Sequence, residues 1–202
     1  MELDTAIRRR AMTRSFQPGP LPADAVDEVL DLARRAPAAG NTAAVSWLVL
    51  DQPGDVARYW ATTLPPERRA TFRWQGLLRA PVLVVLVTDP DAYVARYAEA
   101  DKARAGLGRS AEAWSVPFWW VGAGMVAQNL LLLAAARGWG ACLFGLFDHE
   151  PAVRRTFGLP EHLRTVAAIA LGHPDLDDEP GRSAGRSRPA LDQIRHRGRW
   201  RA

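Results

Sequence analysis

The sequence predicts one α+β domain in which helices cover both faces of a central sheet. Its 202 residues are enough for a single sizeable core. Helical and strand patterns follow one another without strict alternation, which argues against a doubly wound parallel sheet. The run from Pro81 to Thr88 is apolar and rich in β-branched residues on both faces, as expected of a strand at the centre of a sheet. We therefore expect a sandwich with this strand buried inside it.

Four helices and one short strand are expected before the central strand. Apolar residues recur at near-helical spacing between Leu21 and Leu32, after a turn rich in proline. Pro37 and Gly40 break this helix, and Pro65 ends a later one. The expected helices span residues 2–11, 23–36, 55–63 and 71–78, and the expected strand spans residues 47–51.

Three helices, a loop and two strands are expected after the central strand. A helix over residues 91–105 precedes a polar stretch, residues 106–115, that we expect to be a mobile loop. A long apolar helix follows and closes at Arg137 and Gly138 in a C-cap arrangement. Strands are expected over residues 141–144 and 165–171, on either side of a helix over residues 150–157.

The long helix imitates a membrane span, because residues 116–136 carry no formal charge. Pro117, Gly122 and Gly124 interrupt the stretch, as do Gln128 and Asn129, and no second span accompanies it. We therefore predict a central helix buried on nearly all sides, in a core or a dimer interface, and no membrane partner.

The basic charge of the chain is concentrated at its end. Residues 181–202 contain seven arginines and one acid, Asp192, so this tail carries a charge of +6. The net charge of the chain is +4, so the remainder carries about −2. A nucleic-acid binder normally spreads basic residues along a groove-sized surface, so we expect no nucleic-acid partner. Cys142 is the only cysteine, which excludes an intrachain disulfide, and the charged N-terminus is no secretory signal. A cytoplasmic protein is expected.

Two arginine clusters at opposite ends of the chain suggest an anion site. Arg10 and Arg14 lie four residues apart at the end of the predicted first helix, where they would share a face and converge on one anion. Arg186 and Arg188 form the second cluster. The planar guanidinium fork matches phosphate oxygens, although solvated basic surface is the alternative reading.

Motifs of self-sufficient catalysis are missing from the sequence. No G-x-G-x-x-G fingerprint, P-loop or G-x-S-x-G turn occurs, and His149, His162, His173 and His196 are scattered without ligand spacing. Cys142 lies between apolar neighbours, as a buried inert thiol would. An enzyme with this sequence would therefore need a bound cofactor to supply its chemistry, and we predict no metal site.

Four segments in order resemble the FMN-dependent nitroreductase family. Residues 10–16 resemble its opening R-x-S-x-R/K-x-F signature, and residues 36–47 its A-P-S-x-x-N-x-Q-P-W segment. Residues 138–147, after the long helix, resemble its G-L-G-x-x-x-x-G segment. Residues 168–174, followed by Arg186, Ser187 and Arg188, resemble its closing strand and phosphate-binding tail. The resemblance covers nearly the whole chain.

The resemblance implies a fold and an activity. The fold would be a three-layer α-β-α sandwich with a central mixed, mostly antiparallel sheet, in an intertwined homodimer. Residues 1–202 would form one domain, with residues 175–202 as an arm that reaches the partner subunit. The protein would be an FMN oxidoreductase that takes a hydride from NADH or NADPH and reduces nitroaromatics or quinones in a ping-pong cycle. A biosynthetic flavin-dependent dehydrogenase or oxidase, and a non-catalytic flavin-binding protein, are the alternatives.

The resemblance also implies which residues bind the cofactor. Phosphate and ribityl contacts would come from the two ends of the chain, ring contacts from a turn of the partner subunit, and backbone N–H groups from the strand after the long helix. In that order these residues are Arg10, Ala11, Met12, Arg14, Arg186 and Arg188; Ala38, Ala39 and Asn41; and Leu143, Phe144 and Gly145.

Some positions depart from the family pattern. Met12 replaces a common Ser and removes a hydroxyl donor, and Ala43 and Ala44 replace the Gln-Pro that usually follows the Asn. Weaker FMN binding, another flavin or a deazaflavin therefore stay open. Separately, Trp114, Trp119 and Trp120 can form an aromatic wall for a flat substrate, with core or interface packing as the alternative. Trp200 is predicted to anchor the tail on a partner chain.

Overall fold

A four-stranded sheet in the order β1-β2-β4-β3 forms the centre of the computed structural model, which describes residues 1–200. All neighbouring strands are antiparallel. The one parallel contact in the described residues is an isolated bridge between Met12 and Ala141. Every residue of β2 is buried, so the prediction of a central strand there is confirmed. The strands are β1 (Val45–Leu50), β2 (Val82–Thr88), β3 (Gly140–Phe144) and β4 (Arg164–Gly172).

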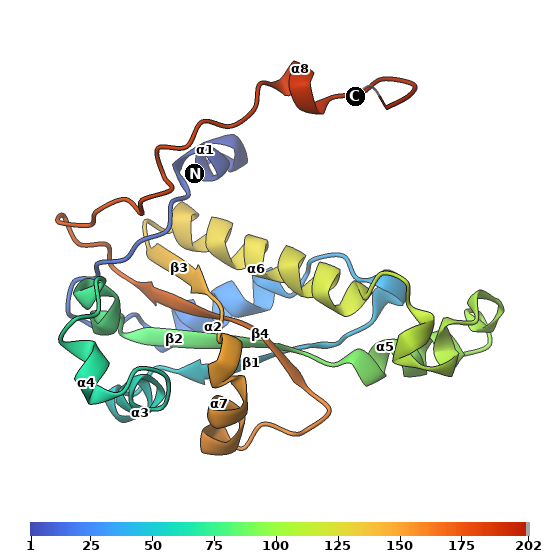
Figure 1. Cartoon of the computed structure of the whole chain (residues 1–202), viewed down its shortest axis with the longest axis horizontal. Helices are drawn as coiled ribbons and strands as arrows, with labels where there is room; N and C mark the ends of the chain where they lie inside the picture. The colour runs from blue at the N-terminus through green and yellow to red at the C-terminus, as the bar shows by residue number, and fades with distance from the viewer. Residues whose placement is uncertain (201–202) are drawn as a thin grey trace.

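Helices cover both faces of the sheet (Figure 1). On one face, α2 (Ala23–Ala33) and α6 (Phe118–Ala136) pack against alternate residues of β2 such as Val84. On the other face, α3 (Pro53–Thr63) and α7 (Glu150–Phe157) pack against the intervening residues, such as Val85. Period-two alternation thus feeds two separate apolar layers from one buried strand. The predicted sandwich is confirmed.

The short elements differ most from the prediction. The remaining helices are α1 (Leu3–Arg9), α4 (Pro66–Arg69), α5 (Pro90–Ala98) and α8 (Leu191–Ile194). The helix predicted over residues 71–78 is wrong, because only a 3₁₀ turn, Gln75–Arg79, forms there. That turn runs so close to the N-terminal segment that a Cβ on Gly76 would lie 2.3 Å from Ser15 Oγ. The helix predicted over residues 91–105 ends at Ala98.

The predicted mobile loop, residues 106–115, is a folded segment instead. It forms two 3₁₀ turns, Leu107–Arg109 and Ala111–Ala113. Gly108 lies against the end of α5, where a Cβ would come within 2.3 Å of Ala98 N. The Trp114 indole N–H closes the segment by donating to the Leu107 carbonyl at 3.0 Å. Because Gly108 has no side chain and Trp114 donates a hydrogen bond within the segment, this polar stretch packs closely against α5.

α6 is buried on one face only within a protomer. By length and composition it could cross a membrane, but eight of its nineteen residues are buried, against α2 and the sheet among others. Phe118, Trp120 and Val121 on its other side are each about 40% exposed. The predicted burial on nearly all sides is thus incomplete in a single chain.

The chain after β4 crosses the N-terminal segment before it leaves the sandwich. Asp175 N–H donates to the Ser15 carbonyl at 2.9 Å, and the Asp175 carboxylate pairs with Arg79 at 2.6 Å. Arg14 N–H donates to Asp178 Oδ1 at 2.7 Å. The segment that carries α8 then projects away from the sheet beyond α1 (Figure 1). The two ends of the chain are therefore held side by side where the tail begins.

Candidate functional site

The N-terminal segment that carries the first arginine cluster is extended rather than helical. α1 ends at Arg9, and Arg10 has φ −54° and ψ 118°. Thr13 N–H then donates to the Ala141 carbonyl at 2.9 Å. The backbone here therefore pairs with the edge of β3 and does not continue the helix. The predicted convergence of Arg10 and Arg14 on one helix face is therefore wrong. Strand pairing outweighs the local helical pattern here.

Three arginines from the two ends of the chain line one cavity. Its volume is about 580 Å³, and its lining residues are Asp4, Ile7, Arg8, Arg10 and Arg188. Arg10 and Arg188 were predicted as phosphate ligands, and the fold brings them together although 178 positions separate them. Each guanidinium offers five N–H donors in a planar fork, so this donor set fits a phosphate group. Arg8 was missed, and the run Arg8-Arg9-Arg10 was the available signal.

Arg14 and Arg186 are not among the residues that line this cavity. The Arg14 guanidinium donates to the Met12 carbonyl at 3.0 Å and lies 5.1 Å from the centre of the Trp74 ring. A Cβ on Gly181 would come within 3.0 Å of Arg14 Cζ, so the tail passes directly over it. Arg186 N–H closes a turn onto the Ser183 carbonyl at 3.2 Å. The Arg14 side chain thus contacts the N-terminal segment, Trp74 and the tail, and helps to hold them together.

The outer edge of β3 presents a backbone donor beside the N-terminal segment. Because the Ala141 carbonyl accepts from Thr13, period-two alternation directs the Leu143 N–H to the same edge and the Phe144 N–H toward β4. The Leu143 N–H lies 3.4 Å from Met12 Sδ. The Phe144 ring stacks on Trp60 at 5.8 Å. Of the three predicted ring-facing donors, Leu143 therefore faces outward, Phe144 faces β4, and Gly145 lies just beyond the end of β3.

An exposed aromatic residue follows this strand. Phe147 is 85% exposed and has φ +48°, a conformation that bulky residues rarely adopt. Its ring covers Gly145, where a Cβ would lie 2.8 Å from Phe147 Cζ. No local sequence pattern indicates this residue, because a positive φ at a residue other than Gly or Asn cannot be recognised from its neighbours.

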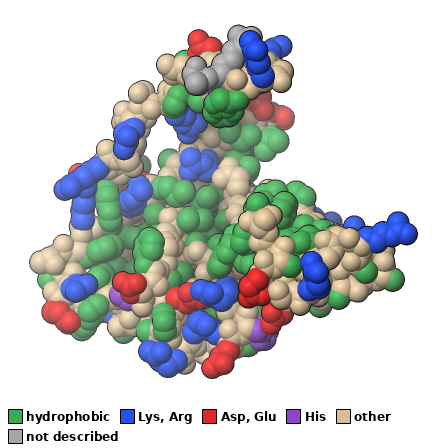
Figure 2. All heavy atoms as spheres, turned by 45° about the vertical axis from the view of Figure 1, so that its right-hand side comes forward, with side chains coloured by type: hydrophobic (Ala, Val, Ile, Leu, Met, Phe, Trp, Pro, Cys, Tyr) green, Lys and Arg blue, Asp and Glu red, His purple; other side chains and the backbone are tan. Residues whose placement is uncertain are grey.

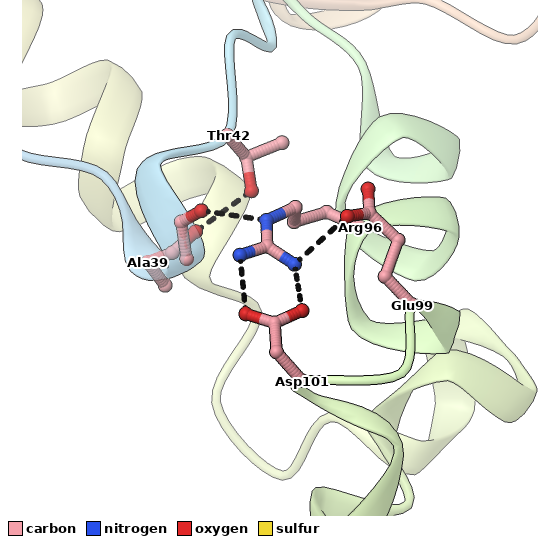
Figure 3. A network of polar contacts seen from close by, with 6 residues as sticks. Ala39, Thr42, Arg96, Glu99 and Asp101 are labelled. Atoms are coloured by element: carbon pink, nitrogen blue, oxygen red, sulfur yellow. Dashed lines mark hydrogen bonds and ion pairs between the residues drawn. The ribbon is translucent and has the colours of Figure 1, made fainter.

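The turn at Ala38, Ala39 and Asn41 is rigidly held. Gly40 and Asn41 adopt φ +66° and +54°, and Thr42 Oγ1 donates to the Ala39 carbonyl at 2.7 Å. Arg96 of α5 donates to the Gly40 carbonyl at 2.9 Å and forks onto both Asp101 oxygens at 2.7 and 2.8 Å (Figure 3). The hydrogen bond from Arg96 lowers the pKa of the Asp101 carboxyl.

This turn and the arginine cavity are separated along α6. A cavity of about 430 Å³ lies between the turn, at Ala38 and Asn41, and α6, at Gly122 and Val126. α1 instead shares a depression with the far end of α6, up to Ala136. Gly122 and Ala136, the outermost α6 residues of the two hollows, are fourteen positions or about 21 Å apart, and the nearest, Val126 and Asn129, are three positions apart. A single protomer therefore keeps these two groups of predicted residues apart.

Two of the three tryptophans predicted as an aromatic wall are buried in packing. Trp114 and Trp119 are 6% and 7% exposed, and their ring centres lie 6.0 Å apart in a cluster with Tyr93. The wall of three rings is therefore wrong. Trp120 is 38% exposed, and the Arg164 guanidinium lies over its ring, 6.0 Å from the ring centre. Aromatic residues entering a helix were recognised, but the side of the helix on which each ring lies was not.

Another cavity, of about 840 Å³, is lined by none of the predicted site residues. Pro18, Val56, Trp60 and Arg79 are among its lining residues. The Trp60 indole N–H is buried, and no partner for it lies within residues 1–200. We therefore place the candidate site at the arginine cavity and the β3 edge, which carry predicted site residues, rather than at this hollow. Cys142 behind that edge is 4% exposed, and burial raises the pKa of its thiol, as predicted for an inert residue.

Comparison with known proteins gives a consistent result. The model of the nitroreductase family matches residues 7–173. A Thermus thermophilus NADH dehydrogenase is 28% identical over 89% of this chain and 90% of its own length. A 4-nitrobenzoate reductase from a Nocardioides strain is 29% identical over 94% of this chain and 87% of its own length. A Streptococcus pneumoniae nitroreductase family structure aligns with a TM-score of 0.74, 21% identity and coverage of 96% and 99%. A putative Desulfovibrio desulfuricans nitroreductase in complex with FMN aligns with a TM-score of 0.70, 23% identity and coverage of 100% and 99%.

Proposed function

The chain belongs to the nitroreductase family and is an oxidoreductase, and from that premise we propose that it uses FMN to carry hydride equivalents from NADH or NADPH to a flat, electron-poor acceptor. The observation that carries the proposal is the cavity lined by Arg8, Arg10 and Arg188. Three guanidiniums against the single carboxylate of Asp4 leave a net positive site that suits the dianionic phosphate of FMN. A similar fold from Desulfovibrio desulfuricans is known in complex with FMN.

The β3 edge would hold the flavin ring next to that phosphate site. Bound FMN would supply the redox chemistry, accepting a hydride from the nicotinamide and passing it to the acceptor in a ping-pong cycle. The protein would contribute position and electrostatics. The outward Leu143 N–H is a fixed dipole that favours negative charge on a ring placed against it. No titrating side chain is required for that role.

A second copy of the chain would complete the site. The turn at Ala38, Ala39 and Asn41 is too far along α6 to join the arginine cavity of its own protomer, so we propose that it borders the flavin of the partner. The exposed apolar residues of α1 and α6, Leu3 and Val121 among them, suit burial in a homodimer. Figure 2 shows hydrophobic side chains gathered over the body beneath the projecting C-terminal segment. Trp200, 79% exposed, would anchor that arm on the partner.

The acceptor is proposed to be a nitroaromatic or a quinone. One similar protein reduces 4-nitrobenzoate according to its name. Trp120 and Phe147 keep exposed aromatic faces on which a flat acceptor can stack. Either ring would act by positioning the acceptor, which raises the rate of hydride transfer without covalent participation.

An absorbance spectrum of the purified protein tests the proposal first. We expect a flavin spectrum, release of FMN on heating, and bleaching when NADH or NADPH is added without oxygen. Addition of 4-nitrobenzoate or a benzoquinone should then restore the oxidised spectrum. Sedimentation or light scattering of the same sample should give the mass of a dimer.

The same experiment separates the alternatives. A flavin that is bound but never bleached by either nicotinamide would favour a biosynthetic dehydrogenase or oxidase whose own substrate donates the hydride. A flavin that is reduced by dithionite and reoxidised by no acceptor or oxygen would favour a non-catalytic flavin-binding protein. A protein that neither contains FMN nor takes it up would contradict the proposal.

A further inference from the structure

The cavity of about 840 Å³ beside α3 is called the α3 cavity below. We propose that it binds an amphipathic monocarboxylate, whose carboxylate bonds to Arg69 and to the Trp60 indole N–H and whose apolar body lies along α3. The cavity is within the size range of small-molecule sites, about 300–1,000 Å³. None of the residues predicted to bind the cofactor lines it, so the inference concerns a second site and goes beyond the proposed function.

The α3 cavity follows one face of α3 and is mostly apolar. Its lining residues on this helix lie at positions i, i+3, i+4 and i+7, which form a single stripe: Pro53, Val56, Ala57 and Trp60. This stripe is about 10.5 Å long at 1.5 Å per residue. The other walls come from the segments 18–23 and 78–81, with Leu21 among them, and from Arg69. An elongated apolar body therefore fits this cavity better than a compact polar one.

The two ends of the stripe differ in charge. Asp51 lines the cavity just before α3 begins, and its carboxylate accepts from Gln52 Nε2 at 3.1 Å. Arg69 lies near the other end, because its Nε donates to the Leu64 carbonyl at 2.9 Å, while Leu64 N–H donates to the Trp60 carbonyl at 2.8 Å. An anionic head group is therefore attracted to the Trp60 end of the stripe and repelled from the start of the helix.

Donors without a partner lie at the Trp60 end. The terminal nitrogens of Arg69 make no hydrogen bond or ion pair with residues 1–200. The Trp60 side chain is 7% exposed, and its indole N–H likewise has no acceptor among those residues. Folded proteins rarely leave such a donor unpaired, because burial removes it from water. A carboxylate has two acceptor oxygens, so one head group can serve both side chains.

Arg79, the other arginine of the α3 cavity, is engaged within the fold. Its guanidinium donates to the Phe16 carbonyl and to Ser15 Oγ, both at 2.9 Å, and to the Asp175 carboxylate at 2.6 Å. Three of its five N–H donors are therefore used. We assign the head group to Arg69, whose terminal donors are unused.

Titration of the purified full-length protein with decanoate tests the proposal. In spectra of ¹⁵N-labelled protein, we expect the Trp60 indole N–H signal to shift with a saturable dependence on decanoate, as it gains an acceptor. Loss of the signal in Trp60→Phe assigns it. Decylammonium has the same chain and the opposite charge, and calorimetry should show that it binds at least tenfold more weakly than decanoate.

Two pairs of variants locate the site. Arg69→Gln should weaken decanoate binding about tenfold, as expected for the loss of one charge-assisted hydrogen bond. Arg68→Gln is its matched control, because Arg68 is the preceding residue of α4, is exposed and lies outside the cavity. Ala57→Trp fills the cavity and should weaken binding at least tenfold. Ala61→Trp, one turn further along α3 at an exposed position outside the cavity, should not.

The outcomes decide separate parts of the inference. No saturable change with decanoate, or wild-type affinity in Ala57→Trp, would overturn the site. Equal affinity for decanoate and decylammonium, or no loss in Arg69→Gln, would overturn the carboxylate assignment. Decanoate that binds and leaves the Trp60 indole signal unmoved would overturn the role of that N–H. FMN binding should be unchanged in all four variants, so a wild-type protein that binds decanoate as expected and never binds FMN would contradict only the proposed function.

Discussion

Arginine performs opposite tasks in two regions of this protein. Beside the turn at residues 39–41, Arg96 of α5 is close to saturated: the Gly40 carbonyl, Glu99 and both oxygens of Asp101 accept hydrogen bonds from four of its five N–H donors (Figure 3). In the arginine cavity, the guanidiniums of Arg8, Arg10 and Arg188 make no hydrogen bond or ion pair within the described residues. The same side chain therefore rigidifies one region and leaves donors available in the other.

The difference shows how a basic cluster can be interpreted. A guanidinium whose donors nearly all bond to the protein itself makes that region more rigid, and neighbouring carboxylates neutralise its charge. A guanidinium beside a hollow with unused donors keeps both its charge and its hydrogen-bonding capacity for a ligand. Arg14 lies between these two cases, because its guanidinium donates one hydrogen bond, to the Met12 carbonyl, and packs against the Trp74 ring.

The largest expected effect comes from removing the unused donors. Arg10→Gln together with Arg188→Gln should weaken FMN binding about a hundredfold, since two charge-assisted hydrogen bonds of about 1.5 kcal/mol each are lost. Fluorescence titration with FMN measures this, and the loss should shrink at high salt. Arg58→Gln is the matched control, because Arg58 pairs with Asp55 on α3, at 3.1 Å. Unchanged affinity in the double variant would refute the phosphate assignment.

The next effect tests whether the N-terminal segment must lie flat on β3. A Cβ on Gly140 would come within 2.7 to 2.9 Å of Thr13 side-chain atoms. Gly140→Ala should therefore displace residues 12–14, lower the free energy of unfolding by about 1–3 kcal/mol and weaken FMN binding with it. Urea unfolding and FMN titration measure the two changes.

Gly54→Ala is the control for this substitution, because nothing lies within 4 Å of the added atom on α3. Its unfolding free energy and FMN affinity should stay near the wild-type values. If Gly140→Ala lowers the free energy of unfolding but leaves FMN affinity unchanged, residues 12–14 do not hold the cofactor.

A smaller effect is expected from the saturated arginine. Arg96→Gln removes the hydrogen bonds to the Gly40 carbonyl and Asp101. It should lower the melting temperature by about 3 °C, as expected when a chain of this size loses about 1 kcal/mol of unfolding free energy. FMN affinity should fall less than in the Arg10 and Arg188 double variant, and kcat should fall, as the proposed position of the turn beside the partner's flavin requires. A normal kcat with a lowered melting temperature would confine the turn to a structural role.

The sequence predicts the parts of this molecule that local pattern decides. The central strand at residues 82–88 and the helix at residues 150–157 follow from unbroken apolar or amphipathic runs. The end of α1 does not, because the pairing of Thr13 with Ala141 is a contact across 128 positions. The cavity role of Arg8, the burial of Trp114 and the positive φ of Phe147 are likewise set by tertiary packing. Residue types at the site were recognisable, but their partners were not.

The smallest expected effect separates the two arginine regions by pH. The Arg96 hydrogen bond holds the pKa of Asp101 below its usual 3.8, so the stabilisation is present above that pH and is lost as the pH falls through the lowered pKa. The difference in melting temperature between wild type and Asp101→Asn should therefore be constant above about pH 5 and shrink below 3.8. Calorimetry from pH 7 to pH 3 measures it. A difference that persists at low pH would mean that the contact acts through packing, and that the saturated arginine is not held by charge.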